Sequence, residues 1–156
     1  MNMMAMRQSI NAENIEKEVD ISSLYISNHI EYKRRHDLES LFHVWKVEIV
    51  CDEIPGKLFN TKPIIVAKMY RPPNTSVNDF ITCMDQFLSC ISSEGKLSYI
   101  MGDYNVNLIN VNQHKLTSDL ISNMFSHSFI PLIDRPTRIN PYSATLIDNI
   151  YTNTIK

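Results

Sequence analysis

Residues 99–108 read YIMGDYNVNL, and they are the most informative short stretch in the chain. An apolar run ends at Gly102, and Asp103 and Asn105 follow before alternation of polar and apolar residues resumes. Gly, Asp and Asn are the usual residues of a tight turn, so an ordinary turn explains the stretch. A carboxylate and an amide held at a strand tip to handle a phosphate explain it equally well. Alternate residues of an extended segment point the same way, so Asp103 and Asn105 can act on one group.

The segments before this stretch predict a β-hairpin. Residues 42–50 (FHVWKVEIV) alternate between polar and apolar side chains, which indicates a half-buried strand. Residues 64–70 (IIVAKMY) are mostly apolar and rich in β-branched side chains, which indicates a buried strand. The connection, residues 52–62, contains Pro-Gly and is expected to turn. A further short strand is expected at residues 23–26, followed by a turn.

Two helices and three more strands are expected in the rest of the chain. Apolar residues recur at steps of three and four between Val77 and Ile91, Ser76 can cap this helix with Asp79 nearby, and Gly95 can end it. The second helix is expected at residues 118–126, with Leu120, Ile121, Met124 and Phe125 facing inward. Strands are expected at 97–101, 130–133 and 146–151, with a loop at 135–142. A weaker pattern suggests a short helix at 12–18.

This order of elements predicts a single α/β domain. The chain has 156 residues, of which 44% are hydrophobic and 21% charged, so it can form an ordinary core. Hairpins with interposed helices suggest a layered α/β sandwich whose loops gather at one edge. The formal net charge is −2, so nucleic-acid binding would need a local basic patch.

Several classes of protein do not fit the sequence. The three cysteines include no CxxC pair, which argues against a disulfide framework and a zinc knuckle. No N-terminal signal peptide and no run of about 18 apolar residues is found. We therefore expect an intracellular protein, nuclear or cytoplasmic, with no membrane partner and no small-molecule cofactor.

Two further motifs could carry chemistry. Tyr70 and Arg71 end a strand just before Pro72 and could face a phosphate, although strands commonly end at proline for structural reasons. Asp148 lies in the mostly apolar segment 146–150 (LIDNI), which follows a Pro-Thr-Arg-Ile sequence at 136–139. A buried, unpartnered carboxylate is costly, so Asp148 is expected to have a functional partner or to face solvent.

Taken together and in this order, YRPPN (70–74), GDYN (102–105) and PTRINPYSATLIDNIYTN (136–153) resemble the endonuclease/exonuclease/phosphatase superfamily. The chain is most similar to the apurinic-type endonuclease domain of non-LTR (LINE-like) retrotransposons. This resemblance implies an α/β fold of the DNase I type, here a partial four-layered sandwich of two mostly antiparallel sheets flanked by helices. It covers residues 23–156, whereas residues 1–22 form an unmatched polar leader.

The resemblance also implies roles for individual residues in Mg²⁺-dependent hydrolysis of DNA phosphodiesters. Asp103 would orient or deprotonate the attacking water, while Asn105 and Tyr70 would hold the phosphate. Asp148 would orient a catalytic histidine, and Arg71 would contact the substrate backbone. Asp103 and Asn105 would also be the metal ligands, forming an incomplete Mg²⁺ site.

The sequence departs from the family pattern at both ends. No residue matches the metal-binding glutamate that the family carries near its start. None of the five histidines occupies the place of the catalytic histidine. We therefore expect a retrotransposon endonuclease domain truncated at both ends, inactive or weakly active. The alternative is a non-catalytic remnant that binds nucleic acid or protein.

Overall fold

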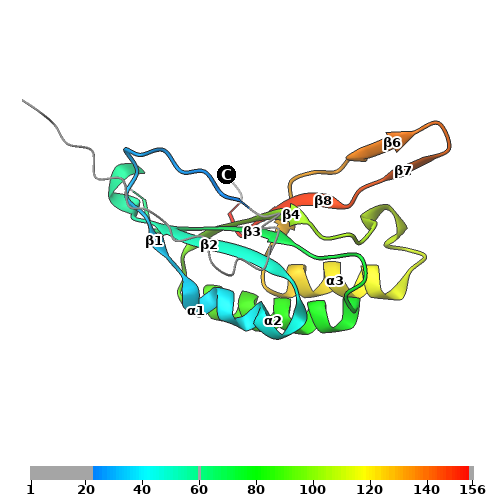
Figure 1. Cartoon of the computed structure of the whole chain (residues 1–156), viewed down its shortest axis with the longest axis horizontal. Helices are drawn as coiled ribbons and strands as arrows, with labels where there is room; N and C mark the ends of the chain where they lie inside the picture. The colour runs from blue at the N-terminus through cyan, green and yellow to red at the C-terminus, as the bar shows by residue number, and fades with distance from the viewer. Residues whose placement is uncertain (1–22, 60, 155–156) are drawn as a thin grey trace, which may run out of the picture.

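The computed structural model describes residues 23–59 and 61–154, which form a mixed α/β fold around one large sheet (Figure 1). The sheet has six strands in the order β1-β2-β3-β4-β8-β5, and a two-stranded sheet joins β6 and β7. The strands are β1 (Lys33–Arg34), β2 (Glu48–Ile54), β3 (Ile64–Tyr70), β4 (Leu97–Asp103), β5 (Ile130–Pro131), β6 (Arg138–Asn140), β7 (Ser143–Thr145) and β8 (Asp148–Thr152). The helical elements are α1 (His36–Glu39), η1 (Ser40–Trp45), η2 (Gly56–Phe59), α2 (Val77–Ser93), η3 (Leu108–Asn110) and α3 (Lys115–Ser126).

The pairing of the central strands brings three of the expected site residues to one end of the sheet. β2 and β3 form the expected antiparallel hairpin. β3 and β4 are parallel and are connected by α2, which places Tyr70 beside Asp103. β4 and β8 are antiparallel, which places Asp103 beside Asp148. The carboxyl ends of β3 and β4 and the first residue of β8 therefore meet.

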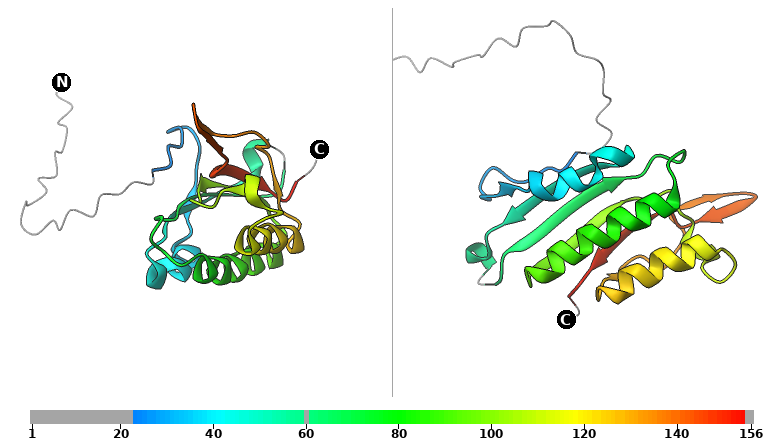
Figure 2. Two further views of the ribbon diagram at one scale, coloured as in Figure 1. Left: turned by 90° about the vertical axis from the view of Figure 1, so that its right-hand side faces the viewer. Right: turned by 90° about the horizontal axis from the view of Figure 1, so that it is seen from below.

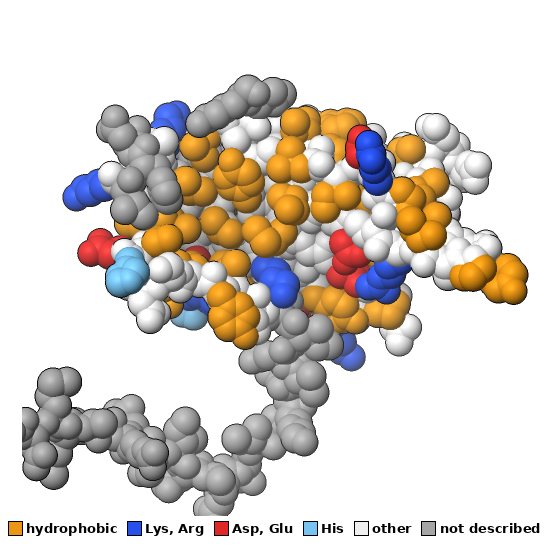
Figure 3. Space-filling view, turned by 90° about the horizontal axis from the view of Figure 1, so that it is seen from above, with side chains coloured by type: hydrophobic (Ala, Val, Ile, Leu, Met, Phe, Trp, Pro, Cys, Tyr) orange, Lys and Arg blue, Asp and Glu red, His pale blue; other side chains and the backbone are white. Residues whose placement is uncertain are grey.

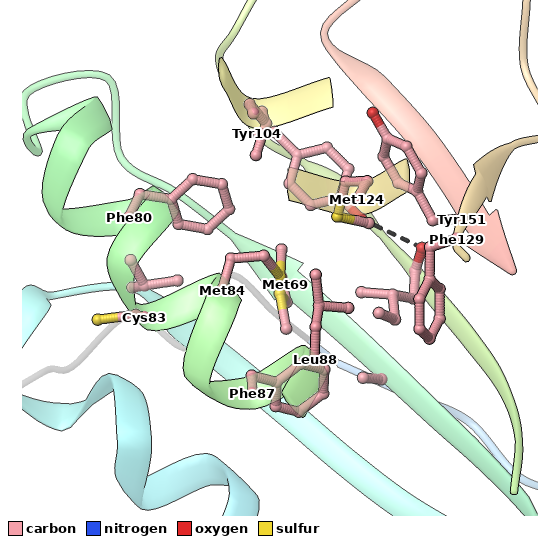
Figure 4. Close-up of a cluster of buried hydrophobic side chains, with 14 of the residues drawn as sticks. Met69, Phe80, Cys83, Met84, Phe87, Leu88, Tyr104, Met124, Phe129 and Tyr151 are labelled. Atoms are coloured by element: carbon pink, nitrogen blue, oxygen red, sulfur yellow. Dashed lines mark hydrogen bonds between the residues drawn. The ribbon is translucent and has the colours of Figure 1, made fainter. Parts of the chain in front are cut away.

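The long helix α2 confirms the expected pattern and supplies much of the core. The Ser76 side chain accepts a hydrogen bond from the Asp79 amide, as an N-cap does. Of the apolar residues at steps of three and four, Val77 and Ile81 are partly buried and the others are fully buried in the core, and the chain leaves the helix at Gly95 with φ +60°. Figure 4 shows this core, in which Tyr104 also packs edge-on against Tyr151.

The prediction of a strand at residues 42–50 is wrong over its first half. Residues 40–45 form η1, Lys46 is left-handed with φ 56°, and β2 begins only at Glu48. Phe42 is fully buried against Phe87, with ring centroids 5.6 Å apart, while Val44 is 80% exposed. Packing of Phe42 on α2 therefore overrides the local alternation. Residues 23–26, also expected as a strand, have no regular structure, although residues 28–29 do turn.

Other boundaries shift by a few residues. α3 begins at Lys115, and Phe125, expected to face inward, is 52% exposed. The expected loop at 135–142 contains β6, which pairs with β7 as a hairpin. β5 ends at Pro131 and β8 begins at Asp148, so both differ from the expected bounds. The expected leader 1–22, with its helix at 12–18, lies outside the described residues.

The helices α1, α2 and α3 lie on one face of the large sheet (Figure 2). The opposite face displays many apolar side chains, as Figure 3 shows. These include the half-buried side chains of Ile64, Val66, Tyr99, Met101 and Ile150. The α/β class is thus confirmed, and the described part of the chain provides one large sheet with a helical layer on one face. Within this part, no helix is long and apolar enough to cross a membrane.

Candidate functional site

Three of the expected site residues come together at one end of the large sheet. Tyr70, Asp103 and Asp148 occupy neighbouring register positions on β3, β4 and β8, so their side chains leave the same face. All three line one open pocket of about 430 Å³, together with Lys68 and Asn149. The pocket opens on the face that carries no helices, next to the loops that follow β3 and β4 and the loop that precedes β8. It lies at the strand tips where the sequence predicted a phosphate-handling site, and that role stays a prediction.

The GDYN turn owes its shape to Gly102 and Asn105. A Cβ atom on Gly102 would lie 2.0 Å from the carbonyl oxygen of Met69, so only glycine permits the close approach of β3 and β4. Asn105 has φ 47°, a left-handed conformation that asparagine tolerates. Its amide N–H donates to Oδ1 of Asp103 at 2.9 Å, which closes a turn. The stretch is thus a tight turn that also fixes the carboxylate of Asp103 at a strand tip.

Arg71 joins this turn to the loop that follows β3. Its guanidinium is buried, with the residue 2% exposed, and donates to the carbonyl oxygens of Tyr104 at 2.6 Å and Asn105 at 2.8 Å. It also donates to the carbonyl of Thr75. Burial lowers the pKa of Arg71, although Asp103 opposes this effect. Arg71 was expected to contact substrate, but in the structure its guanidinium contacts the protein backbone and holds two loops together.

Asn105 takes part in the same connection. Its side-chain Nδ2 donates to the carbonyl oxygen of Arg71 at 2.8 Å. The side-chain amide of Asn105 therefore has a structural partner in the loop after β3. Its expected role as a phosphate ligand stays a prediction, as do the catalytic roles of Tyr70, Asp103 and Asp148.

Sequence reasoning missed Arg138, which is the closest cation to the two carboxylates. Its Nη2 donates to Oδ2 of Asp103 at 2.6 Å, and its Nε lies 3.9 Å from Oδ2 of Asp148. Arg138 is the first residue of β6. The only signal in the sequence was the presence of an arginine in the segment that leads to Asp148. No neighbouring residue indicated that this arginine would contact Asp103.

Asp148 has no histidine partner among the described residues. All five histidines lie within this part of the chain, and none of them lines the pocket. His127 pairs with Asp85 on α2, and His114 contacts Thr117 on α3. The ionic partner of Asp148 is Arg138. This agrees with the expectation that the carboxylate of Asp148 has a partner or faces solvent.

Two asparagines, Asn149 and Asn107, bind the backbone of the segments around the pocket. Neither was predicted as a site residue. Oδ1 of Asn149 accepts from the Ile133 amide at 3.3 Å, and its Nδ2 donates to the Ile133 carbonyl at 2.9 Å. Oδ1 of Asn107 accepts from the Leu146 amide at 3.0 Å. These contacts attach the segments on either side of β6 and β7 to the body. Because each pairs residues far apart in the sequence, no local pattern could reveal them.

The residues of the pocket do not fit Mg²⁺ as a protein-only site. Mg²⁺ requires near-ideal octahedral geometry with oxygen ligands. The two oxygens of Asp103 already accept from the Asn105 amide and from Arg138. Residues 23–59 and 61–154 contain no cluster of three or more His, Cys, Asp or Glu side chains that could hold a metal ion. A guanidinium thus stands where the expected cation would neutralise Asp103.

Comparison with solved structures identifies similar folds. The endonuclease domain of TRAS1, a telomere-specific non-LTR retrotransposon, aligns with a TM-score of 0.58 and 12% identity over 80% of this chain and 56% of that domain. An endonuclease/exonuclease/phosphatase family protein from Leptotrichia buccalis gives a TM-score of 0.43 at 16% identity, covering 68% of this chain and 42% of its own. One from Bacteroides thetaiotaomicron gives 0.45 at 10% identity, covering 69% and 40%.

Sequence comparisons add nothing to this result. No protein-family model matches the chain, and no curated protein matches it. The chain spans little more than half the length of the TRAS1 domain. The expected resemblance is confirmed at the level of structure: over four fifths of its length, the chain has the fold of a non-LTR retrotransposon endonuclease domain.

Proposed function

We propose that the chain carries part of a DNA endonuclease site of the endonuclease/exonuclease/phosphatase type and binds a phosphodiester in the pocket at the ends of β3, β4 and β8. The observation that supports this most is the convergence of Tyr70, Asp103 and Asp148, which come from three separate sequence motifs, on one pocket. The fold shared with the TRAS1 endonuclease domain agrees with it.

Each group has a defined chemical capacity there. The carboxylate of Asp103 can accept a proton from an attacking water, while the hydroxyl of Tyr70 can donate to a phosphate oxygen. The ammonium of Lys68, which lines the same pocket, adds positive charge for an anion. Asn105 and Arg71 contribute by fixing the turn that presents Asp103.

We propose that hydrolysis by this chain is slow. Within the described residues, Asp148 lacks an imidazole to orient, and Asp103 has only the carboxylate of Asp148 beside it, so no set of three or more acidic, His or Cys side chains could hold a cation. Catalytic groups that work as a unit lose most of the rate when one is missing. The Mg²⁺ requirement stays a prediction, and we derive no step through the ion because the residues do not fit it.

A second candidate function is non-catalytic binding of nucleic acid. The contact between Arg138 and Asp103 favours it, because the guanidinium occupies Oδ2 of Asp103, one of the two oxygens that could accept a proton from water. Both candidates place a phosphate in the same pocket and differ only in turnover.

The test combines binding of a fluorescent DNA duplex with nicking of supercoiled plasmid in the presence of Mg²⁺. The wild type is expected to bind and to nick slowly, Tyr70→Phe to weaken binding, and Asp103→Asn to remove the residual nicking. Asp134→Asn is the matched control, because Asp134 is exposed and does not line the pocket. Unchanged binding and nicking in both pocket variants would refute the site. Vigorous nicking that Asp103→Asn abolishes would refute slow hydrolysis.

A further inference from the structure

We propose that residues 1–22 of this chain dock on the apolar face of the large sheet, on the side opposite α1, α2 and α3. The proposal names a contact within one chain, so it does not depend on nuclease activity. It follows from an apolar surface on four strands, from the place where residue 23 is attached to that surface, and from the composition of the segment that precedes it.

The register of the four central strands gathers apolar side chains on this face, which we call the open face. Val50, Lys68, Met101 and Ile150 form one row across β2, β3, β4 and β8, and alternate residues of each strand point the same way. Figure 3 shows the open face as a broad apolar surface. An apolar patch of this extent marks a place where another segment or molecule binds. Its apolar side chains, all half-buried, are Val50, Ile54, Ile64, Val66, Leu97, Tyr99, Met101 and Ile150.

The first described residues lie on the open face. The Nζ of Lys68, in the middle of this face, donates to the carbonyl oxygen of Ser23 at 3.2 Å. Leu24 and Ile26 are both half-buried. Figure 1 draws residues 23–32, in blue, on the side of the sheet opposite the helices. The segment that precedes Ser23 is therefore attached on the open face itself.

Residues 1–22 have the length and the composition to cover this surface. Even at the helical rise of about 1.5 Å per residue, 22 residues span about 33 Å. The four strands extend over about 19 by 23 Å at the usual strand spacing and rise. The segment contains eight Met, Ile or Val side chains, and four of the chain's eight methionines fall within its first six residues. Methionine fits irregular apolar surfaces because its side chain is unbranched and polarisable.

A second copy of the chain is the competing occupant of the open face. The four strands offer about 400 Å², whereas each partner of a stable complex buries about 800 Å². A tethered segment acts at an effective concentration in the millimolar range, so it needs far less contact area than a free partner. The contact within one chain is therefore favoured over a dimer.

The experiment uses the full chain with ¹³C-labelled methionine methyl groups, observed by NMR. Met101 lies on the open face, while Met69, Met84 and Met124 are fully buried in the core and serve as internal references. A variant with four apolar residues of the segment replaced by serine is expected to move the Met101 signal and leave the references in place. Fluorescence of the dye ANS, which reports exposed apolar surface, should rise about twofold or more. The replacements are Met3→Ser, Met4→Ser, Met6→Ser and Ile10→Ser.

The matched control replaces four polar residues of the same segment by serine and keeps the net charge, as the apolar variant does. It is expected to change neither the Met101 signal nor the dye fluorescence. The replacements are Asn2→Ser, Gln8→Ser, Asn11→Ser and Asn14→Ser.

Three results would overturn the proposal. The first is an unmoved Met101 signal in the apolar variant, and the second is an equal movement in the control. The third is a Met101 signal that depends on protein concentration in the wild type, together with a dimer in analytical ultracentrifugation, because a second copy would then cover the face. The core references report folding, and the double variant Met3→Ser with Met6→Ser repeats the test if the fourfold variant loses them.

Discussion

The two ends of strand β4 carry opposite kinds of ionic cluster. Where β4 begins, the guanidinium of Arg35 is 9% exposed and contacts Asp37, Glu53 and Glu94 at 2.6–3.0 Å. Where β4 ends, the side chain of Arg138 is 59% exposed and contacts Asp103 closely but Asp148 only at 3.9 Å. The first arginine is enclosed by its partners, and the second lies at the surface on a hairpin.

This difference separates an enclosed ionic cluster from an exposed one. The Arg35 cluster ties α1, β2 and the end of α2 together, with Lys96 bridging Glu53 and Glu94 as well. Its charges are satisfied within the protein. The acids near Arg138 line a pocket, and the side chain of Arg138 is largely exposed to solvent. The same residue types are therefore enclosed at one end of β4 and exposed beside a pocket at the other.

The largest effect is expected from Arg35→Ala. Removing this guanidinium leaves Glu94, Glu53 and Asp37 without their main partner, so the free energy of unfolding should fall by about 3 kcal/mol. Urea denaturation measures this change. Arg138→Ala serves as the comparison and should change the free energy of unfolding by less than about 0.5 kcal/mol. Equal losses at the two sites would remove the distinction between the clusters.

Gly102→Ala should have the next largest effect, because the added methyl group forces β3 and β4 apart. The added Cβ would lie 2.0 Å from the Met69 carbonyl oxygen, which is backbone and cannot rotate away. We expect a loss of about 2 kcal/mol in the free energy of unfolding, together with weaker DNA binding. Gly95→Ala is the control: its Cβ meets no atom, and only the positive φ costs about 1 kcal/mol. A larger loss for Gly95→Ala than for Gly102→Ala would contradict this account.

The Arg35 cluster should also control stability in acid. Hydrogen bonding to Arg35 lowers the pKa of Glu94 from 4.5 to about 2. The stability gained from this pair is therefore complete above about pH 4.5 and disappears as the pH falls towards 2. Glu94→Gln should cost about 2 kcal/mol at pH 7, and the difference from the wild type should shrink across that window. Chemical denaturation at several pH values measures it, and a constant difference would contradict the pairing.

A smaller effect is expected at the cap of α2, which belongs to neither cluster. Ser76→Ala removes the acceptor for the Asp79 amide and should lower the free energy of unfolding by about 1 kcal/mol. Thermal unfolding measures it, with Ser76→Asp as the control that keeps an acceptor. A loss as large as that of Arg35→Ala would show that stability does not depend mainly on the enclosed cluster.

The hydrophobic pattern correctly predicted those elements in which the buried side chains recur at a regular spacing along the sequence. Strand β3 has the expected bounds, and α2 has the expected cap and apolar face, because both bury a regular set of side chains. The segment at 42–46 failed, because Phe42 is buried by α2 rather than by strand alternation. Of the expected site residues, Tyr70, Asp103 and Asp148 end or begin strands and line one pocket, and their catalytic roles stay predictions.

The remaining features of the site depend on contacts between distant segments. Arg138 meets Asp103 across 35 residues of sequence, and Arg71 reaches the GDYN turn across 33 and 34. Arg71 follows Tyr70 in a motif that suggested substrate contact, yet the fold buries its guanidinium. Such roles are set by tertiary packing, which single-sequence periodicity does not encode.

The most direct test is a titration of the ¹⁵N-labelled chain of 18.1 kDa with a short DNA duplex, followed by amide chemical shifts. The largest changes are expected at Tyr70, Asp103, Asn105, Arg138 and Asp148. No change is expected at Arg35, Glu94 and Lys96, at the other end of the sheet. Changes concentrated at the Arg35 end, or no change at the pocket with saturating DNA, would contradict the proposed site.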